Sequence, residues 1–413
     1  MLGVLVVVYA VNFVDRNILS VLLQPIKEEL GASDTAMGVL TGFAFAVFYT
    51  FAGIPIARLA DRGSRRGVMA VGIAFWSLMT AASGLATSFA WLALARIGVG
   101  IGEASATPAA HSILSDYFPP ERRTRAIAIY NTGSSAGILF GLALGGTLKE
   151  LFGWRLAFAV VGLPGLLVAL AVWLLVREPP RGLSEQRSAS AAPPGTLETL
   201  RYLAALRSFR QVALAAALYG VTSYGLLIWA PTFMVRVHQR GYAQTGFELG
   251  MVIGIASAVG VLLGGALCDR MARRDVRWLV WIPALAAWLL APFYVAFALA
   301  PDPALALAAY VPVNLLTAVF AAPTYMIAQG LAQLRMRALA SAVVLFVINL
   351  VGLGAGPMLV GALSDALQPR FGAESLRYAL LLALAFNLWG AVHSVLAGRS
   401  LAGDLARSRA ASL

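Results

Sequence analysis

Long apolar runs alternate with short charged segments over almost the whole chain. A helix that crosses a bilayer needs about 20 largely apolar residues, because the hydrocarbon core is about 30 Å thick and a helix rises about 1.5 Å per residue. Twelve such runs occur, at residues 2–25, 36–60, 67–86, 88–116, 124–149, 155–176, 209–237, 245–269, 276–299, 303–332, 337–365 and 374–398. The pattern therefore predicts an all-α membrane protein with twelve transmembrane helices.

One long polar segment, from Glu178 to about Ser208, separates the sixth run from the seventh. Its prolines and serines are typical of a linker. We therefore expect an N-terminal six-helix bundle, a linker, a C-terminal six-helix bundle and a tail, at residues 1–177, 178–208, 209–398 and 399–413. Most arginines fall in the loops on one side of the predicted membrane, which places both termini and the linker in the cytoplasm.

Composition supports a membrane protein and excludes several other classes. Hydrophobic residues make up 60% of the chain and charged residues 12%, against about 25% charged residues in soluble domains. The net charge of +12 comes without a basic helix or an aromatic stacking motif, so no nucleic acid partner is expected. A single cysteine, Cys268, and scattered histidines give no metal-ligand spacing. Neither a phosphate loop nor a nucleophile with a base is present, so we expect no cofactor, no metal and no enzymatic activity.

Two charged loops repeat one sequence pattern half the chain apart. Asp-Arg-Gly-Ser-Arg-Arg begins at Asp61 and Asp-Arg-Met-Ala-Arg-Arg begins at Asp269, each between two apolar runs. This arrangement indicates an internally duplicated bundle. A conformational latch, in which these side chains meet carboxylates, helix ends or lipid phosphates, is one interpretation, and simple orientation signals are the alternative. The predicted latch residues are Asp61, Arg62, Arg65, Arg66, Asp269, Arg270, Arg273 and Arg274.

The repeated loop motif, the twelve runs and the central linker resemble the major facilitator superfamily. In that family a glycine usually stands four residues before the aspartate. Gly265 fits this place in the second copy, whereas Ala57 departs from it in the first. The resemblance implies two six-helix bundles that face each other across a central cavity and move by alternating access.

Charged residues inside the runs are the strongest candidates for function. Asp15 and Arg16 lie in the middle of the first run, and Arg96 and Glu103 lie in the fourth. Each charge costs about 2.5–3.5 kcal/mol at the bilayer centre, so these groups must pair or face water. Counted along their helices, Asp15 and Glu103 both lie about 20 Å from the cytoplasmic edge, which predicts one polar layer.

We expect Asp15, Arg16 and Glu103 to couple proton binding to substrate binding. In this hypothesis Arg16 pairs with a carboxylate in one state and with an anionic substrate in another. A static salt-bridge network between two helices is the alternative. The expected supporting polar tier consists of Arg96, Asn12 and His111.

Within the superfamily, the details resemble the spinster family. Asn12-Phe-Val-Asp15-Arg16, the segment from Ala95 to Ser105 around Glu103, and Asp116-Tyr-Phe-Pro119 carry the resemblance. Spinster proteins are transporters of sphingosine-1-phosphate or lysophospholipids in animals, so the resemblance implies proton-linked movement of an amphiphilic anion. The anion:cation symporter family has a similar Asp-Arg and Gly-Glu, so a small organic anion such as a sugar acid is the alternative substrate.

Further residues are predicted to line a cavity or to pack helices. The cavity candidates, each of which also fits ordinary packing, are Tyr130, Asn131, Tyr224, Trp229, Asn314, Tyr325 and Asn349. Glycines recur every four residues from Gly133 to Gly145 and predict close helix contact. The expected partners are a small-molecule or lipid substrate, protons and membrane lipids. Two six-helix halves make a complete transport unit, so a monomer suffices. The preference for arginine over lysine favours a bacterial source and therefore a bacterial inner membrane.

Overall fold

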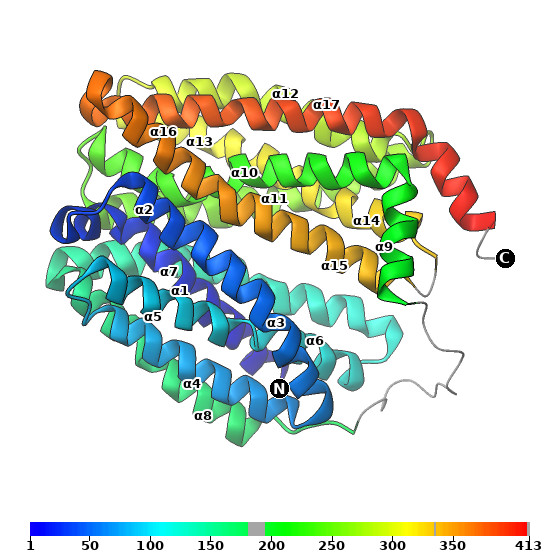
Figure 1. The fold of residues 1–413 in the computed structure, drawn as a ribbon, viewed down its shortest axis with the longest axis horizontal. Helices are drawn as coiled ribbons and strands as arrows, with labels where there is room; N and C mark the ends of the chain where they lie inside the picture. The colour runs from blue at the N-terminus through cyan, green and yellow to red at the C-terminus, as the bar shows by residue number, and fades with distance from the viewer. Residues whose placement is uncertain (181–194, 334–335, 411–413) are drawn as a thin grey trace. The chain divides into compact units, whose positions relative to one another are not determined.

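The computed structural model describes residues 1–180, 195–333 and 336–410, without the side chains of Asp61, Pro120, Glu121, Thr124, Ala338, Arg409 and Ala410 (Figure 1). The regular structure of the described residues is entirely helical. In the first part of the chain the helices are α1 (Leu2–Leu30), α2 (Asp34–Gly38), η1 (Val39–Ala44), α3 (Phe45–Arg62), α4 (Arg65–Ser83), α5 (Phe89–Glu103), α6 (Ala106–Tyr117), α7 (Pro120–Gly162) and α8 (Pro164–Leu175). The expected linker contains α9 (Thr196–Ala205), and its residues 181–194 lie outside the described residues.

The second part of the chain continues in the same way. Its helices are α10 (Arg207–Arg236), α11 (Tyr242–Ala272), α12 (Trp278–Leu299), α13 (Pro303–Thr317), η2 (Ala318–Phe320), α14 (Ala321–Leu331), α15 (Arg337–Val347), η4 (Ile348–Ala355), α16 (Gly356–Phe371), η5 (Gly372–Glu374) and α17 (Ser375–Ala410).

The number of membrane crossings follows from the lengths of the apolar helical segments. Ten segments of the described residues are long and apolar enough to cross a membrane, and two of them, Arg125–Leu175 and Leu339–Ser408, have 51 and 70 residues. Each of these two is long enough for two crossings. Gly153 (φ 81°) and Gly372 (φ 54°) interrupt them with a backbone that glycine adopts without strain. The predicted all-α membrane fold with twelve transmembrane helices is confirmed.

Several of the predicted runs consist of two helices joined by an irregular turn. The fourth run divides into α5 and α6 beside Ser105, whose hydroxyl donates to the carbonyl of Gly102 (2.8 Å). Such a bond back to the preceding turn competes with the helical ladder and bends the chain. The second and eleventh runs each contain a wide turn of π-helix, η1 and η4. Hydropathy does not predict these breaks, because both sides of each break are apolar.

The chain divides into two compact units. Among the described residues, the first contains 1–180 and 228–254, and the second contains 195–227 and 255–410. In the first unit α4 lies beside α8, and in the second α12 lies beside α17 (Figure 1). The expected bundle boundaries at residues 177 and 209 stay a prediction.

In the second unit, the end of α17 is fixed to the start of α10. Asp404 is fully buried, and its carboxylate accepts hydrogen bonds from the backbone N–H (2.9 Å) and the hydroxyl (2.6 Å) of Ser208. A carboxylate that meets the N–H groups at a helix N-terminus caps that helix. Leu203 of α9 and Leu401 and Leu405 of α17 join the same hydrophobic core.

Candidate functional site

Glycines of α7 hold α1, the helix that carries two of the candidate charges. A side chain at Gly137 would place its Cβ 2.4 Å from the carbonyl oxygen of Ala10 and 2.5 Å from the Cβ of Phe13. A Cβ added at Gly133 or Gly141 would likewise lie 2.6 or 3.0 Å from backbone atoms of α1. Small residues at every fourth position let two helix backbones approach closely. This packing fixes the position of α1 at the depth where Asp15 and Arg16 lie.

Arg16 of α1 pairs with Glu103 at the end of α5. Its Nη2 and Nε donate to Glu103 Oε2 at 2.7 and 3.2 Å. Glu103 is fully buried, whereas the Arg16 side chain keeps 20% of its surface exposed. Removing one partner of such a pair would leave a charge in surroundings of low dielectric. The two helices are therefore joined by a charge pair that depends on both members.

Aromatic rings surround the Arg16 guanidinium on its other sides. The ring centroids of Phe45, Phe13 and Tyr49 lie 4.7, 5.1 and 5.3 Å from Arg16 Cζ. At such distances a ring face attracts a cation. Sequence reasoning missed these residues, although Phe45 and Tyr49 stand four residues apart and so share one face of α3. The Arg16 guanidinium is therefore contacted by apolar ring faces as well as by its carboxylate partner.

Asp15 is buried in a different environment from its neighbour in sequence. Its side chain is fully buried, and both carboxyl oxygens lack a hydrogen-bond partner among the described residues. The charges of Glu103 and Arg96 act on this carboxyl, and Thr80 and Trp76 of α4 lie beside it. An ionised carboxylate without hydrogen bonds is costly in such surroundings. Asp15 and Glu103 thus form two buried acidic groups, of which Glu103 pairs with an arginine and Asp15 forms no ion pair among the described residues.

Two of the three expected supporting residues lie beside these two acids. Arg96 is 3% exposed, and its Nη2 donates to the backbone oxygen of Asp15 at 3.3 Å. Asn12 is also 3% exposed and lies beside the Glu103 carboxyl. The third expected member, His111, is on α6, where its ring meets the ring of Tyr130 edge to face with centroids 5.5 Å apart. The structure thus brings Arg96 of α5 and Asn12 of α1 to the two acids, whereas His111 lies against Tyr130, and the role of these residues stays a prediction.

The first of the two repeated loops contains one buried arginine. Arg65, at the start of α4, donates to the carbonyl of Pro179 (2.6 Å), to the carboxylate of Glu178 (3.3 Å) and to Asp116 of α6. Burial raises the pKa of Glu178, but hydrogen bonds from Ser64 and Arg65 together bring it below its usual value. Arg65 therefore connects the start of α4 to the end of α6 and to the segment that follows α8.

The remaining predicted latch residues differ in their surroundings. The side chain of Asp61 lies outside the described residues. Arg62 is exposed, and Arg66 is half-buried with its guanidinium 5.0 Å from the ring centroid of Trp173. In the second copy the exposed residues are Asp269, Arg270, Arg273 and Arg274. Their role as a latch stays a prediction.

The cavity candidates divide between the two units. In the first unit Tyr130 is fully buried and stacks on Tyr9 with centroids 4.4 Å apart, and Asn131 is exposed. Trp229 in the same unit is 1% exposed, which fits packing.

In the second unit Tyr224 and Tyr325 are half-buried neighbours. The amide of Asn314 donates to the carbonyl of Tyr310 (2.9 Å) within its own helix. Asn349 lies half-buried in the wide turn η4. Tyr224, Tyr325 and Asn349 therefore retain partly exposed surface.

Comparison with known proteins places this fold and site in a family. Residues 5–357 match the Major Facilitator Superfamily, so the chain belongs to this superfamily of membrane transporters. An MFS-type efflux pump of Mycolicibacterium smegmatis is 36% identical over 394 residues, which are 94% of this chain and 90% of that protein.

Two further relatives and one crystal structure narrow the comparison. Protein spinster homolog 1 of Xenopus tropicalis is 28% identical over 395 residues, 90% of this chain and 75% of that protein. A probable L-galactonate transporter of Escherichia coli is 28% identical over 272 residues, 64% of this chain and 60% of that protein. The crystal structure of a bacterial homologue of the human lysosomal transporter Spinster superposes with a TM-score of 0.89 and 32% identity, covering 98% of this chain and 97% of that one. The resemblance to spinster proteins is confirmed.

Proposed function

We propose that this chain is a proton-linked secondary transporter that moves an amphiphilic anion, of the lysolipid or sphingolipid kind, by alternating access. The observation that carries the proposal is the buried Arg16–Glu103 pair beside the unpaired carboxyl of Asp15. Ionisable groups inside a membrane-spanning segment are costly, and they commonly mark proton relays and substrate paths.

The coupling follows from the number of charges in this layer. While Glu103 is ionised it neutralises the Arg16 guanidinium, so an anion gains little from approaching Arg16. When Glu103 takes up a proton, the positive charge of Arg16 becomes available to an anionic headgroup. Proton binding and substrate binding then favour each other, as reciprocal linkage requires. The aromatic rings around Arg16 suit an amphiphile, because they offer apolar surface next to the cation.

A small organic anion is the second candidate substrate. Its support is the similarity to a protein named as a probable L-galactonate transporter. A sugar acid would need several hydrogen-bonding groups besides one cation, whereas a lipid needs an apolar surface. The two candidates therefore differ in what they require beyond Arg16.

Transport by purified protein in liposomes tests the proposal. We would impose a pH gradient in either direction and measure movement of a fluorescent lysolipid and of radiolabelled L-galactonate. Glu103→Gln and Asp15→Asn are expected to abolish the dependence on the gradient for whichever substrate moves. Glu29→Gln is the matched control, because Glu29 is also paired with an arginine, Arg155, but lies exposed.

The outcomes separate the candidates. Lysolipid movement that requires the gradient and Glu103 would support the proposal. Movement of galactonate alone would make the small organic anion the substrate instead of the lipid. Gradient-driven transport that persists unchanged in Glu103→Gln would refute the assigned coupling site and leave a static salt bridge as its role.

We further propose that the protein works as a monomer in a bacterial inner membrane with both termini in the cytoplasm. The support is the excess of arginine in the loops on one predicted side. Reporter fusions at either terminus, which are fluorescent only in the cytoplasm, test the orientation. If the fusions at both termini are not fluorescent, both termini lie outside the cytoplasm and the proposed orientation is wrong.

A further inference from the structure

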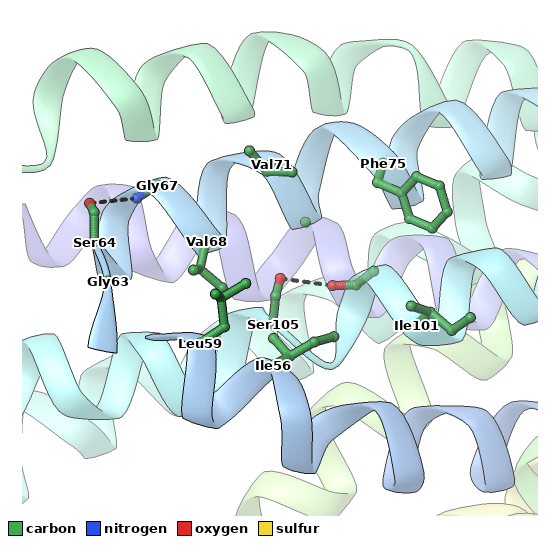
Figure 2. Close-up of a pocket in the computed structure, with 12 residues that line it drawn as sticks. Ile56, Leu59, Gly63, Ser64, Gly67, Val68, Val71, Phe75, Ile101 and Ser105 are labelled. Carbon is green, nitrogen blue, oxygen red and sulfur yellow. Dashed lines mark hydrogen bonds between the residues drawn. The ribbon is translucent and has the colours of Figure 1, made fainter. Parts of the chain in front are cut away.

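A groove lies on the first unit between α3, α4 and α5 (Figure 2). It encloses about 460 Å³, a volume typical of small-molecule sites. Ile56 and Leu59 of α3 form one wall, Val68, Val71 and Phe75 of α4 form another, and Ile101 of α5 lies at the far end (Figure 2). The groove is separate from the charged layer, whose residues do not line it.

The interior of the groove suits an apolar chain. Its polar side chains are Ser64 and Ser105, and both are engaged in hydrogen bonds. The hydroxyl of Ser105 donates to the Gly102 carbonyl (2.8 Å), and that of Ser64 accepts from the Gly67 N–H (3.0 Å) and bonds the Glu178 carboxylate. A ligand therefore finds apolar contact along the groove.

The position and length of the groove indicate where such a chain comes from. Leu59 and Val71, which line it, are 61% and 68% exposed within segments that cross the membrane, so lipid surrounds its opening. Along α4 the groove runs from Ser64 to Phe75, a rise of about 16 Å. One leaflet contributes about half of a hydrocarbon core that is about 30 Å thick. The groove thus matches one acyl chain of one leaflet in length.

The end of the groove at Ser64 carries positive charge. The sequence from Arg58 to Arg66 contains four arginines and one aspartate. Arg65 is buried against carboxylates and the Arg66 guanidinium packs on Trp173 of α8, but Arg58 and Arg62 are exposed. Basic residues at the membrane surface attract anionic headgroups.

We propose that this groove binds one acyl chain of an anionic phospholipid of the surrounding bilayer, with its phosphate against Arg62. The lipid then packs against Ile101 and Gly102, directly before Glu103, on the outer side of the turn that holds the Arg16 pair. The proposal is independent of the transported substrate, because its readout is lipid binding.

Native mass spectrometry of the detergent-solubilised protein tests it by titration with phosphatidylglycerol and with phosphatidylcholine of the same acyl chains. Val71→Trp fills the groove, and the matched control Leu78→Trp lies two turns along the same helix face, is also exposed and does not line the groove. We expect one tightly held phosphatidylglycerol in the wild type and in Leu78→Trp. In Val71→Trp its affinity should fall about tenfold or more. Elution as a single species on size exclusion checks folding, and Val71→Phe serves as a gentler second variant.

The charge contribution is tested by the single variant Arg62→Gln. It should lower the affinity for phosphatidylglycerol about tenfold or more and remove the preference over phosphatidylcholine. Arg277→Gln, an exposed arginine before α12, is the control and should leave the preference intact. Equal retention of the two lipids by the wild type, or equal binding by Val71→Trp and Leu78→Trp, would overturn the proposal.

Discussion

The Arg16–Glu103 pair predicts a large and non-additive effect on stability. Replacing Arg16 by Gln leaves a fully buried carboxylate without its cation, and breaking a buried pair in this way costs about 3–5 kcal/mol. Replacing Glu103 by Gln leaves a cation that keeps 20% of its surface exposed and contacts aromatic rings. That variant should lose only the charged hydrogen bonds, about 1.5–3 kcal/mol.

The double variant separates the pair from its two members. With both residues changed to Gln, neither member of the pair is left as a charge without its partner, so we expect the double variant to be more stable than Arg16→Gln by itself. The resulting coupling energy should be about 2–3 kcal/mol, at the upper end of measured pairs. Reversible unfolding in mixed micelles, followed by tryptophan fluorescence, gives the four free energies of unfolding that the cycle requires.

The exposed pair between Glu29 and Arg155 is the control for this cycle. Their side chains are 49% and 40% exposed, and solvent screening limits such a pair to about 1 kcal/mol or less. If the coupling energy of Arg16 and Glu103 is no larger than that of the exposed pair, burial does not govern the interaction and the reasoning is wrong.

Three further predictions concern the supporting structure. Gly137→Ala places a methyl group 2.4 Å from a backbone oxygen of α1 and should destabilise the protein by about 1–3 kcal/mol, whereas Gly265→Ala, with nothing within 4 Å, should be neutral or slightly stabilising in the same unfolding assay. Because the pKa of Glu178 is below its usual value, the ionised carboxylate adds to the free energy of unfolding above about pH 4.3. This stabilisation is lost as the pH falls through the pKa of Glu178 in the folded state. The free energy of unfolding, measured against pH, should therefore fall less at acidic pH in Glu178→Gln than in the wild type. Identical profiles would contradict this. Asp404→Ala leaves the Ser208 donors unpaired and should cost about 1–3 kcal/mol, with amide hydrogen exchange rising first at the start of α10.

The sequence predicted the crossings well, because hydropathy over about 20 residues reports directly on the membrane. It did not predict the break between α5 and α6 or the wide turns η1 and η4, which depend on single hydrogen bonds and on packing. The glycine spacing from Gly133 to Gly145 was informative, because only close contact with another helix explains a small residue at every fourth position.

The site was predicted in outline and incompletely in detail. Counting residues along the helices predicted that Asp15 and Glu103 lie at similar depth, and the structure pairs Arg16, the neighbour of Asp15 in the sequence, with Glu103. Sequence alone left open which acid Arg16 contacts. Neighbours such as Asp15 and Arg16 point in directions about 100° apart on a helix, so they do not share a partner. The rings of Phe45 and Tyr49 come from another helix, whose rotation only the packed structure fixes.

The aromatic rings around Arg16 have a consequence for the energetics of a full transport cycle. Each ring face attracts the guanidinium by about 0.5–2 kcal/mol whatever the charge on Glu103. Whenever that carboxyl is neutral, the cation still has a favourable place in the protein and need not return to water. Because this attraction is the same in both charge states, it does not change the free-energy difference between them. Its effect is to hold the guanidinium at one place in the protein, so that in the proposed coupling a substrate anion would find the cation in the same position whenever the carboxyl is neutral.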